Sequence, residues 1–380
     1  MMNSTSAFTI ALLVGVAGWL LAAEKIEKSE KTELWVISGQ SNACGRAPLP
    51  GLDPDPRAEM YDPARAAWVP AQEPIPGMNG TVGPWIATAR EYVAKSGTRL
   101  RLVGSATGGT PIRNFLNSRT RTSTGNALRA AIKDRGQHAD VFLWYQGEND
   151  AYDGRKTEEY LTDLKALVAE VRTLANHPGM TILVVQIGSG IYKEPRVDFM
   201  PIREAQRQFV VQDGNALLVT ALGRKMGDYV HLGREGYFEL GGEMARALVK
   251  TRLGRKDVDW PGPVLDAAVL GADGTVAVAH FAEVNLLSGC RAKDFAAVDA
   301  DGVATCVTSE AGKTVVNLVF ERAVKLPANL VYGYGQAPAA TLTDEAGNRA
   351  PAVHLEMSSG APPADAPGSA PNGAGKSTGR

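Results

Sequence analysis

Short apolar runs recur along the first two thirds of the chain, and segments with a helical spacing of apolar residues separate them. The runs have the length of buried strands and lie at 34–38, 100–105, 141–145, 181–187 and 216–220. The helical segments lie at 86–95, 127–135, 158–174, 202–212 and 235–252. Strict alternation of strand and helix predicts an α/β fold: a three-layer, doubly wound, flavodoxin-like sheet of five parallel strands with helices on both faces.

The alternation breaks in two places. The proline-rich stretch 48–84 leaves the carboxyl end of the first strand, and we interpret it as an insertion that lines a site. Beyond residue 260 the pattern changes to short alternating runs separated by Gly, Asp and Asn, which predicts a small β-sandwich-like C-terminal domain. We place the α/β domain at 31–257, the β-rich domain at 262–357 and a disordered tail, rich in Ala, Pro, Gly and Ser, at 358–380.

The N-terminal segment has a composition of its own. Residues 8–21 are uncharged and mostly apolar, and Ala22 and Ala23 follow them. This run is shorter than the roughly 20 residues that a membrane-spanning helix needs, so it predicts a secretory signal peptide over 1–23. The absence of Lys and Arg before the run leaves an uncleaved anchor or a buried first helix open. We expect a secreted or periplasmic protein without stable membrane insertion after cleavage.

Composition and charge narrow the function classes. Apolar residues make up 44% of the chain and charged ones 21%, which excludes a wholly disordered or fibrous protein. Forty basic and 41 acidic side chains leave a net charge of -1, so no overall field attracts nucleic acid, and we expect no nucleic-acid partner. Three cysteines are too few for a zinc finger or a disulfide-built fold; whether Cys290 and Cys306 pair stays open.

Candidate chemistry begins where the first strand ends, in Gly39-Gln40-Ser41-Asn42. A serine in a glycine-flanked turn at the carboxyl end of a strand exposes its hydroxyl and turns its own amide toward a pocket, as a nucleophile requires. The same residues also suit an ordinary turn or helix cap.

Polar motifs follow the second and third strands as well. Gly108-Gly109-Thr110 allows backbone amides to approach a ligand closely, as an oxyanion hole needs, although a loop with positive φ has the same requirement. The third strand runs into Gln146-Gly147-Glu148-Asn149-Asp150. Asn149 offers an uncharged N–H donor for an oxyanion, and Glu148 and Asp150 suit roles in orienting neighbours or capping a turn.

A histidine follows the fifth strand, with a carboxylate three residues before it. One local turn can bring Asp228 onto one ring nitrogen of His231 while the other nitrogen faces Ser41. The remaining histidines lack such a setting, and we treat them as background: His138, His177, His280 and His354.

These four motifs follow different strands of one parallel sheet, so all four loops open at the same edge. Together they resemble the SGNH (GDSL-like) hydrolases and, within them, the sialate O-acetylesterase and acetylxylan esterase branch of carbohydrate esterases. The resemblance rests on Gly39-Gln40-Ser41-Asn42, Gly108-Gly109-Thr110, the 146–150 motif and Asp228-Tyr229-Val230-His231, and it covers about residues 33–250. The C-terminal region is less specifically similar.

The resemblance implies a role for each motif. Ser41 is then the nucleophile, His231 the general base and acid, and Asp228 the residue that orients His231. The oxyanion hole would combine the Ser41 amide, a glycine amide, which we assign to Gly108 over Gly109, and the Asn149 side chain. Three residues are expected to bind substrate: Gln40, Gln146 and Glu148. Gln40 stands where the wider group usually has Asp, which matches the carbohydrate branch. No metal or organic cofactor is implied.

The expected function is therefore that of a serine esterase that removes acetyl groups from O-acetylated carbohydrates, either a polysaccharide or sialic acid. Tyr61, Trp68 and Trp85 are candidates for stacking on sugar rings, although aromatic side chains near an insertion are more often buried. Three alternatives stay open: a general short-chain aryl or alkyl esterase, an O-acyltransferase, and a catalytically idle glycan-binding module.

Overall fold

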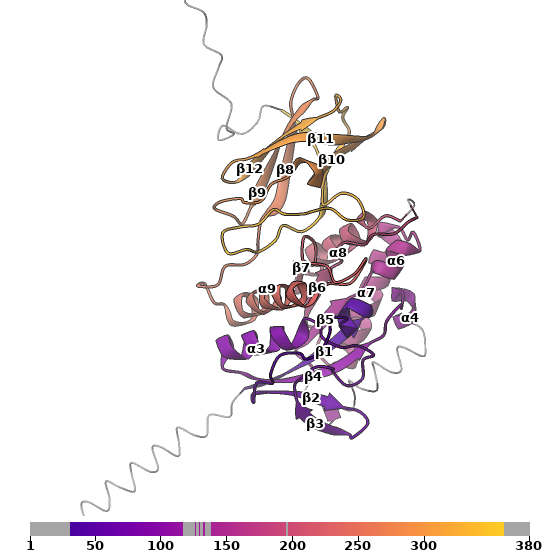
Figure 1. Ribbon diagram of the computed structural model, residues 1–380, viewed down its shortest axis with the longest axis vertical. Helices are drawn as coiled ribbons and strands as arrows, with labels where there is room; N and C mark the ends of the chain where they lie inside the picture. Colours follow the sequence, from indigo (N-terminus) through magenta and orange to yellow (C-terminus); the bar gives the residue numbers. More distant parts are fainter. Residues whose placement is uncertain are drawn as a thin grey trace, which may run out of the picture.

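The computed structural model describes residues 31–116, 126, 129, 132–133, 138–194 and 197–360. The predicted signal peptide, most of the helical segment 127–135 and the tail beyond residue 360 lie outside the described residues. The described chain forms an α/β unit followed by a β-rich unit (Figure 1).

A seven-stranded sheet with the order β3-β2-β4-β1-β5-β6-β7 forms the first unit. Five adjacent strands of this sheet are parallel to one another and correspond to the five apolar runs. They are β1 (Thr32–Gly39), β4 (Arg99–Ala106), β5 (Val141–Tyr145), β6 (Thr181–Gln186) and β7 (Ala216–Thr220). The prediction of five strands was two strands short. The 48–84 insertion supplies β2 (Ala58–Asp62), parallel to β4, and the antiparallel edge strand β3 (Ala67–Pro70).

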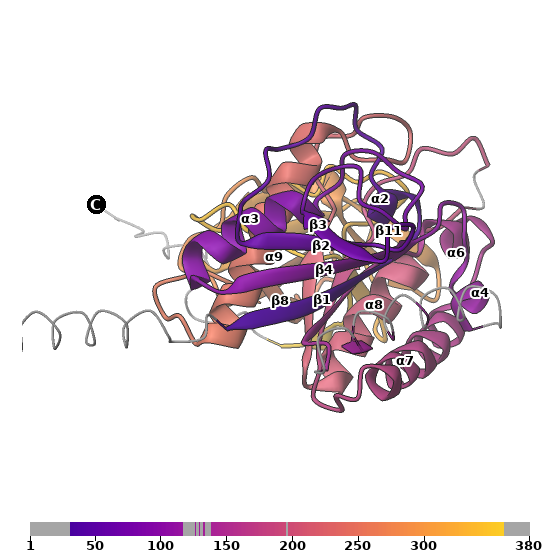
Figure 2. The ribbon, with the colours of Figure 1, turned by 90° about the horizontal axis from the view of Figure 1, so that it is seen from below.

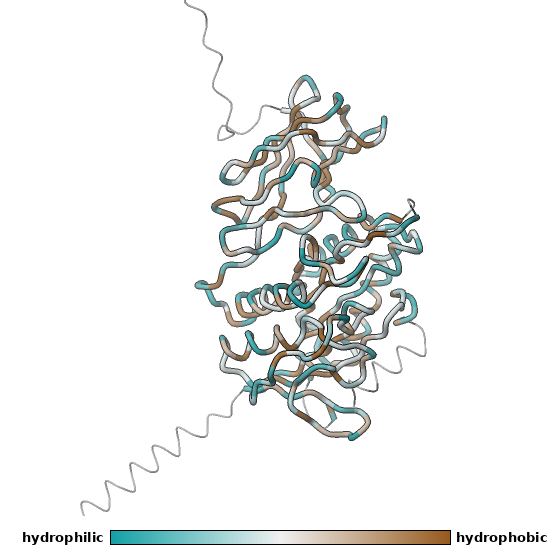
Figure 3. Tube along the Cα trace, viewed as in Figure 1, coloured by the Kyte–Doolittle hydropathy of each residue, from teal (hydrophilic) through white to brown (hydrophobic). Residues whose placement is uncertain are grey.

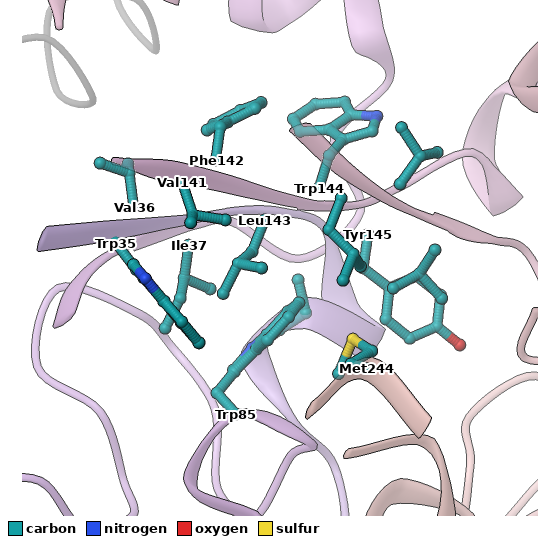
Figure 4. Close-up of a cluster of buried hydrophobic side chains, with 14 of the residues drawn as sticks. Trp35, Val36, Ile37, Trp85, Val141, Phe142, Leu143, Trp144, Tyr145 and Met244 are labelled. Atoms are coloured by element: carbon teal, nitrogen blue, oxygen red, sulfur yellow. The ribbon is translucent and has the colours of Figure 1, made fainter. Parts of the chain in front are cut away.

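Helices cover both faces of this sheet. One face carries α3 (Trp85–Ser96) and α9 (Arg234–Leu253), whose Trp85 and Met244 lie on the same side as Ile37 and Leu143 (Figure 4). The other face carries α7 (Thr157–Leu174) and α8 (Met200–Asp213), which pack against each other (Figure 2). Three short helices complete the unit: α2 (Ser41–Cys44), α4 (Ile112–Leu116) and α6 (Glu148–Tyr152). Burial on both faces explains why the strands read as continuous apolar runs.

The β-rich unit is an eight-stranded sheet with the order β14-β13-β10-β11-β12-β9-β8-β15. Its strands are β8 (Val264–Leu270), β9 (Val276–Ala282), β10 (Phe295–Asp299), β11 (Gly302–Ala311), β12 (Val315–Phe320), β13 (Asn329–Tyr332), β14 (Val353–Glu356) and β15 (Ser358–Ser359). β14 also contacts β8, and the buried apolar residues of this unit belong to a core cluster distinct from that of the α/β unit. Figure 3 shows the apolar positions along its strands. Ser358 and Ser359, which we had placed in the tail, pair with β8.

The two units pack against each other through buried polar contacts. The Gln186 side chain at the end of β6 donates to the Ala352 carbonyl and accepts from the Ala352 amide, both at 2.8 Å. Cys44, Cys290 and Cys306 are free thiols and form no disulfide bond. Among the described residues, no helix has the length and apolar character needed to cross a membrane.

Candidate active site

Ser41 stands where β1 ends against β5. The Gln40 amide donates to the Tyr145 carbonyl at 3.0 Å, which keeps the turn next to the sheet. Gly39 has φ +138, and a Cβ there would lie 2.0 Å from the Tyr145 carbonyl oxygen. Only glycine therefore allows this bend, which places Ser41 at the first position of α2 at the carboxyl edge of the sheet.

A chain of short contacts links Ser41 to a carboxylate. The Ser41 Oγ lies 2.9 Å from His231 Nε2, and His231 Nδ1 lies 2.7 Å from Asp228 Oδ2. Asp228 Oδ1 accepts from the amides of Val230 at 2.9 Å and His231 at 2.7 Å. Partial burial raises the pKa of Asp228, but these hydrogen bonds outweigh it and hold the pKa below its ordinary value. Asp228 thus stays ionised and fixes the ring with Nε2 toward the hydroxyl.

Asn42 ties three loops of the site together, a role that the sequence analysis did not assign. Its Nδ2 donates to Glu148 Oε1 at 2.6 Å and to the Val230 carbonyl at 3.1 Å. Its Oδ1 accepts from the Leu232 amide at 3.2 Å and from the Tyr237 hydroxyl at 2.8 Å. Because every hydrogen-bonding position of the amide is used, Asn42 holds the histidine loop in register with α2 and α6.

Gln40 presents a free donor. Its Oε1 accepts from Gln146 Nε2 at 3.0 Å, from the Gly147 amide at 3.3 Å and from the Asn149 amide at 3.2 Å. Two of these donors are backbone N–H groups, so the oxygen must face them and Nε2 must point the other way. Among the described residues Nε2 meets no acceptor, and Gln40 lines the cavity that contains Ser41.

The other two predicted substrate ligands differ from Gln40. Gln146 is fully buried, and its Nε2 contacts Asp150 while its Oε1 accepts from the Tyr160 hydroxyl at 2.9 Å. It lies behind the cavity wall, so the expectation that it binds substrate was wrong. Glu148 does line the cavity but is only 2% exposed, and burial without a cation raises its pKa to about 7.

Two of the three predicted oxyanion donors are engaged in this structure. The Gly108 amide donates to Asn79 Oδ1 at 3.2 Å, and Asn149 Nδ2 lies 3.4 Å from Asp153 Oδ2. Asn79 belongs to the 48–84 insertion, and the Arg46 guanidinium donates to its carbonyl at 2.6 Å. Asn79 of the insertion and Arg46, which lies just before the insertion, both line the cavity. No motif singled out these two residues.

A cavity of about 600 Å³ surrounds Ser41 and His231. One side carries Tyr152, Tyr192 and Tyr229; the Tyr192 ring lies 5.3 Å from that of Tyr152 and 5.6 Å from that of Tyr229. We call these three residues the tyrosine wall. The sequence analysis did not find it, because Tyr152 ends α6, Tyr192 follows β6 and Tyr229 follows β7.

The aromatic residues that we had proposed for sugar stacking lie elsewhere. Trp85 is buried and donates to the Ala43 carbonyl at 2.6 Å, while Tyr61 and Trp68 pack against each other on the β2–β3 hairpin. Within the described part of the chain, no group of three or more His, Cys, Asp or Glu residues is arranged to hold a metal ion.

A hydroxyl, imidazole and carboxylate in line at the carboxyl edge of a parallel sheet form an arrangement that serine hydrolases use. The family model described as carbohydrate esterase, sialic acid-specific acetylesterase, matches residues 31–250, which is more than half of the chain. The chain belongs to this family, as the sequence predicted, and is a carboxylic ester hydrolase of the carbohydrate esterase class.

Individual relatives support this assignment. A probable carbohydrate esterase from Arabidopsis thaliana is 28% identical over 247 residues, which are 57% of this chain and 89% of that protein. An X-ray structure of an A. thaliana protein is 25% identical with a TM-score of 0.50, over 58% of this chain and 98% of that one. The structure of a carbohydrate acetylesterase from Xanthomonas citri shares the fold, with a TM-score of 0.64 at 17% identity, over 85% of this chain and 80% of that one.

Proposed function

We propose that this esterase removes acetyl groups from O-acetylated carbohydrates through an acyl-enzyme formed on Ser41. The observation that carries the proposal is the relay from Ser41 through His231 to Asp228, with contacts of 2.9 and 2.7 Å. The choice of an acetyl group and of a carbohydrate as the alcohol rests on the family to which the chain belongs. The cavity supports a sugar, because an aromatic wall beside polar side chains suits the apolar face and the hydroxyl groups of a pyranose ring.

The proposed reaction has two halves. His231 Nε2 takes the Ser41 proton as the oxygen attacks the ester carbonyl, and the imidazolium then donates that proton to the departing sugar oxygen. Water enters, gives its proton to His231 and attacks the acetyl–Ser41 ester, which releases acetate and restores the serine. Asp228 stabilises the imidazolium in both halves and stays ionised throughout.

The oxyanion needs N–H donors beside Ser41. We assign the Ser41 amide, the Gly108 amide and the Asn149 side chain, as the family resemblance implies. An oxyanion has to replace Asn79 Oδ1 as the acceptor of the Gly108 amide. Gln40 Nε2 needs no such exchange, since it meets no acceptor among the described residues, so we add it as a donor to the bound ester.

Acetate release tests this proposal directly. The full chain is incubated with acetylated xylan, acetylated pectin and O-acetylated sialic acid, and Ser41→Ala is the control. We expect release from at least one of these carbohydrates by the wild type and none by the variant. Release of p-nitrophenol from p-nitrophenyl acetate without activity on any acetylated carbohydrate would favour a general esterase instead.

We also propose export, on the basis of the apolar segment 8–21. N-terminal sequencing of the protein recovered from the medium or periplasm after expression with its own leader tests this. A mature chain that begins close to Glu24 supports export, and retention of Met1 in the cytoplasm contradicts it.

A further inference from the structure

The tyrosine wall depends on the loop that follows β6. Tyr192 is its central member, because its ring contacts both Tyr152 and Tyr229. Glu194, two residues further along the same loop, also lines the cavity. Whatever holds this loop therefore sets the shape of the part of the cavity that the tyrosine wall lines.

One residue of the β-rich unit holds three positions of this loop. Gln336 Oε1 accepts from the Tyr192 amide at 2.9 Å, and Gln336 Nε2 donates to the Glu194 carbonyl at 3.1 Å. The Gln336 carbonyl accepts from the Gly190 amide at 3.0 Å. Because a residue's amide direction constrains the direction of its Cα–Cβ bond, Gln336 constrains where the Tyr192 ring points.

Gln336 is itself anchored to the α/β unit. It ends the 333–336 loop that follows β13. Arg203 of α8 is fully buried and donates to the carbonyls of Gly333 at 2.9 Å, Gly335 at 2.8 Å and Gln336 at 3.2 Å. Burial lowers the pKa of Arg203 to about 9, so the guanidinium stays charged at neutral pH. The 333–336 loop therefore sits on a rigid base.

The loop that follows β6 also contacts the loop that carries His231. The Ile191 amide donates to the Tyr229 carbonyl at 2.7 Å, two residues before His231. Asp228 and Asn42 also hold the histidine loop, through five further hydrogen bonds to its residues. Loss of the Gln336 contacts should therefore displace the wall much more than the catalytic ring.

We propose that Gln336 is a positioning residue through which the β-rich unit sets specificity for the sugar portion of the substrate. This inference rests on the proposed function, because it assigns the tyrosine wall to the carbohydrate. A small ester reaches Ser41 without touching the wall, whereas a pyranose ring has to pack against it. Gln336 thus acts on binding of the sugar and leaves the chemical step unchanged.

The kinetic test compares two substrates in the full chain. Gln336→Ala removes both side-chain hydrogen bonds, and we expect kcat/KM for glucose pentaacetate to fall about tenfold, mostly through KM. We expect kcat/KM for p-nitrophenyl acetate to stay within about twofold, because no wall contact is involved. Gln208→Ala is the matched control: its Nε2 contacts Glu204 Oε1 at 2.9 Å on α8, away from the cavity, and it should change neither value.

Hydrogen exchange supplies a readout that needs no activity. The Tyr192 amide is protected by Gln336 Oε1, so peptides that contain it should exchange faster in Gln336→Ala and unchanged in Gln208→Ala. Unchanged exchange at Tyr192, or an equal loss of kcat/KM on both substrates, would overturn the inference. Failure of the wild type to hydrolyse either ester would instead overturn the proposed function and leave the exchange result standing.

Discussion

Two buried glutamates lie at opposite ends of neighbouring strands, and their surroundings differ in kind. Glu33, near the start of β1, is fully buried beside Arg252, whose Nη2 lies 3.1 Å from its carboxylate. Glu148, just after β5, is equally buried but has no cation beside it, and its Oε2 meets no hydrogen-bond donor among the described residues. Burial raises the pKa of both. At Glu33, however, the Arg252 charge and the hydrogen bonds from Arg252, Lys31 and Trp35 together outweigh burial, and the net pKa is lowered.

The comparison separates two tasks of one sheet. At the amino edge, buried charge is neutralised, and the residues there contribute to stability. At the carboxyl edge, the Glu148 carboxylate and the side-chain N–H group of Gln40 are left incompletely satisfied beside Ser41, which costs stability and leaves a donor for a substrate. Substitutions at the amino edge should therefore lower stability without changing activity. At the carboxyl edge, substitutions of residues that act on Ser41 or the ester should lower activity with little change in stability, and removal of the buried Glu148 charge should raise stability.

The largest expected effect is at the carboxyl edge. Asp228→Asn removes the charge that orients His231 and stabilises the imidazolium, so we expect kcat to fall by about four orders of magnitude. Thermal unfolding should shift little, because Asp228 is half-exposed. Steady-state hydrolysis of p-nitrophenyl acetate and a melting curve measure both. Retention of a tenth or more of the wild-type kcat would remove Asp228 from the relay.

The next effect is at the amino edge. Arg252→Ala leaves Glu33 buried without its main partner, and we expect a loss of about 3–5 kcal/mol in the free energy of unfolding. The kcat of the folded enzyme should stay unchanged. Glu33→Gln combined with Arg252→Met removes both charges and should recover much of the lost stability in urea denaturation. A double variant as unstable as Arg252→Ala would mean that packing, not charge, dominates there.

Gln40→Glu sharpens the comparison within the active site. Glutamate keeps the oxygen that accepts from the Gly147 and Asn149 amides but removes the free N–H donor. We expect kcat to fall by about two to three orders of magnitude, as for loss of one oxyanion donor. A wild-type melting temperature in the same preparation would show that the loop is intact. Wild-type kcat in this variant would contradict the role of the donor.

The smallest effect is a gain in stability. Burial raises the pKa of Glu148 to about 7 in the folded protein, whereas the unfolded group has its ordinary pKa of 4.5. The burial of Glu148 therefore makes stability fall as pH rises between these values. Glu148→Gln should remove this dependence and stabilise the protein at pH 8 by up to about 3 kcal/mol, with no gain at pH 4.

Urea denaturation at both pH values measures the difference. Glu73→Gln is the matched variant, since burial also raises the pKa of Glu73 to about 7 in the 48–84 insertion, outside the relay. Equal stability of Glu148→Gln and wild type at pH 8 would show that the Glu148 carboxylate is not penalised by burial.

The sequence predicted what local pattern and topology determine. The five buried parallel strands are recognisable in the sequence as apolar runs. Because the strands are parallel, Ser41 and His231 come together at one edge of the sheet although 190 positions separate them. The hairpin of β2 and β3 was missed because it is short, lies at the sheet edge and is flanked by prolines, so its period-two pattern is weak.

What the sequence could not predict depends on side-chain direction and on contacts between units. Gln146 and Glu148 lie two residues apart in one motif. Gln146 is hydrogen-bonded to Tyr160 and does not line the cavity, whereas Glu148 does. The link from Gln336 to Tyr192 spans 144 positions, and no local pattern records it.

Covalent labelling tests the central claim, that His231 activates Ser41 as the nucleophile, most directly. The full chain is treated with diisopropyl fluorophosphate, and the modified residue is located by peptide mass spectrometry. We predict a single phosphoryl ester on Ser41 in the wild type and none in His231→Ala. Labelling at another residue that accompanies loss of esterase activity, or equal labelling of Ser41 without His231, would contradict the account.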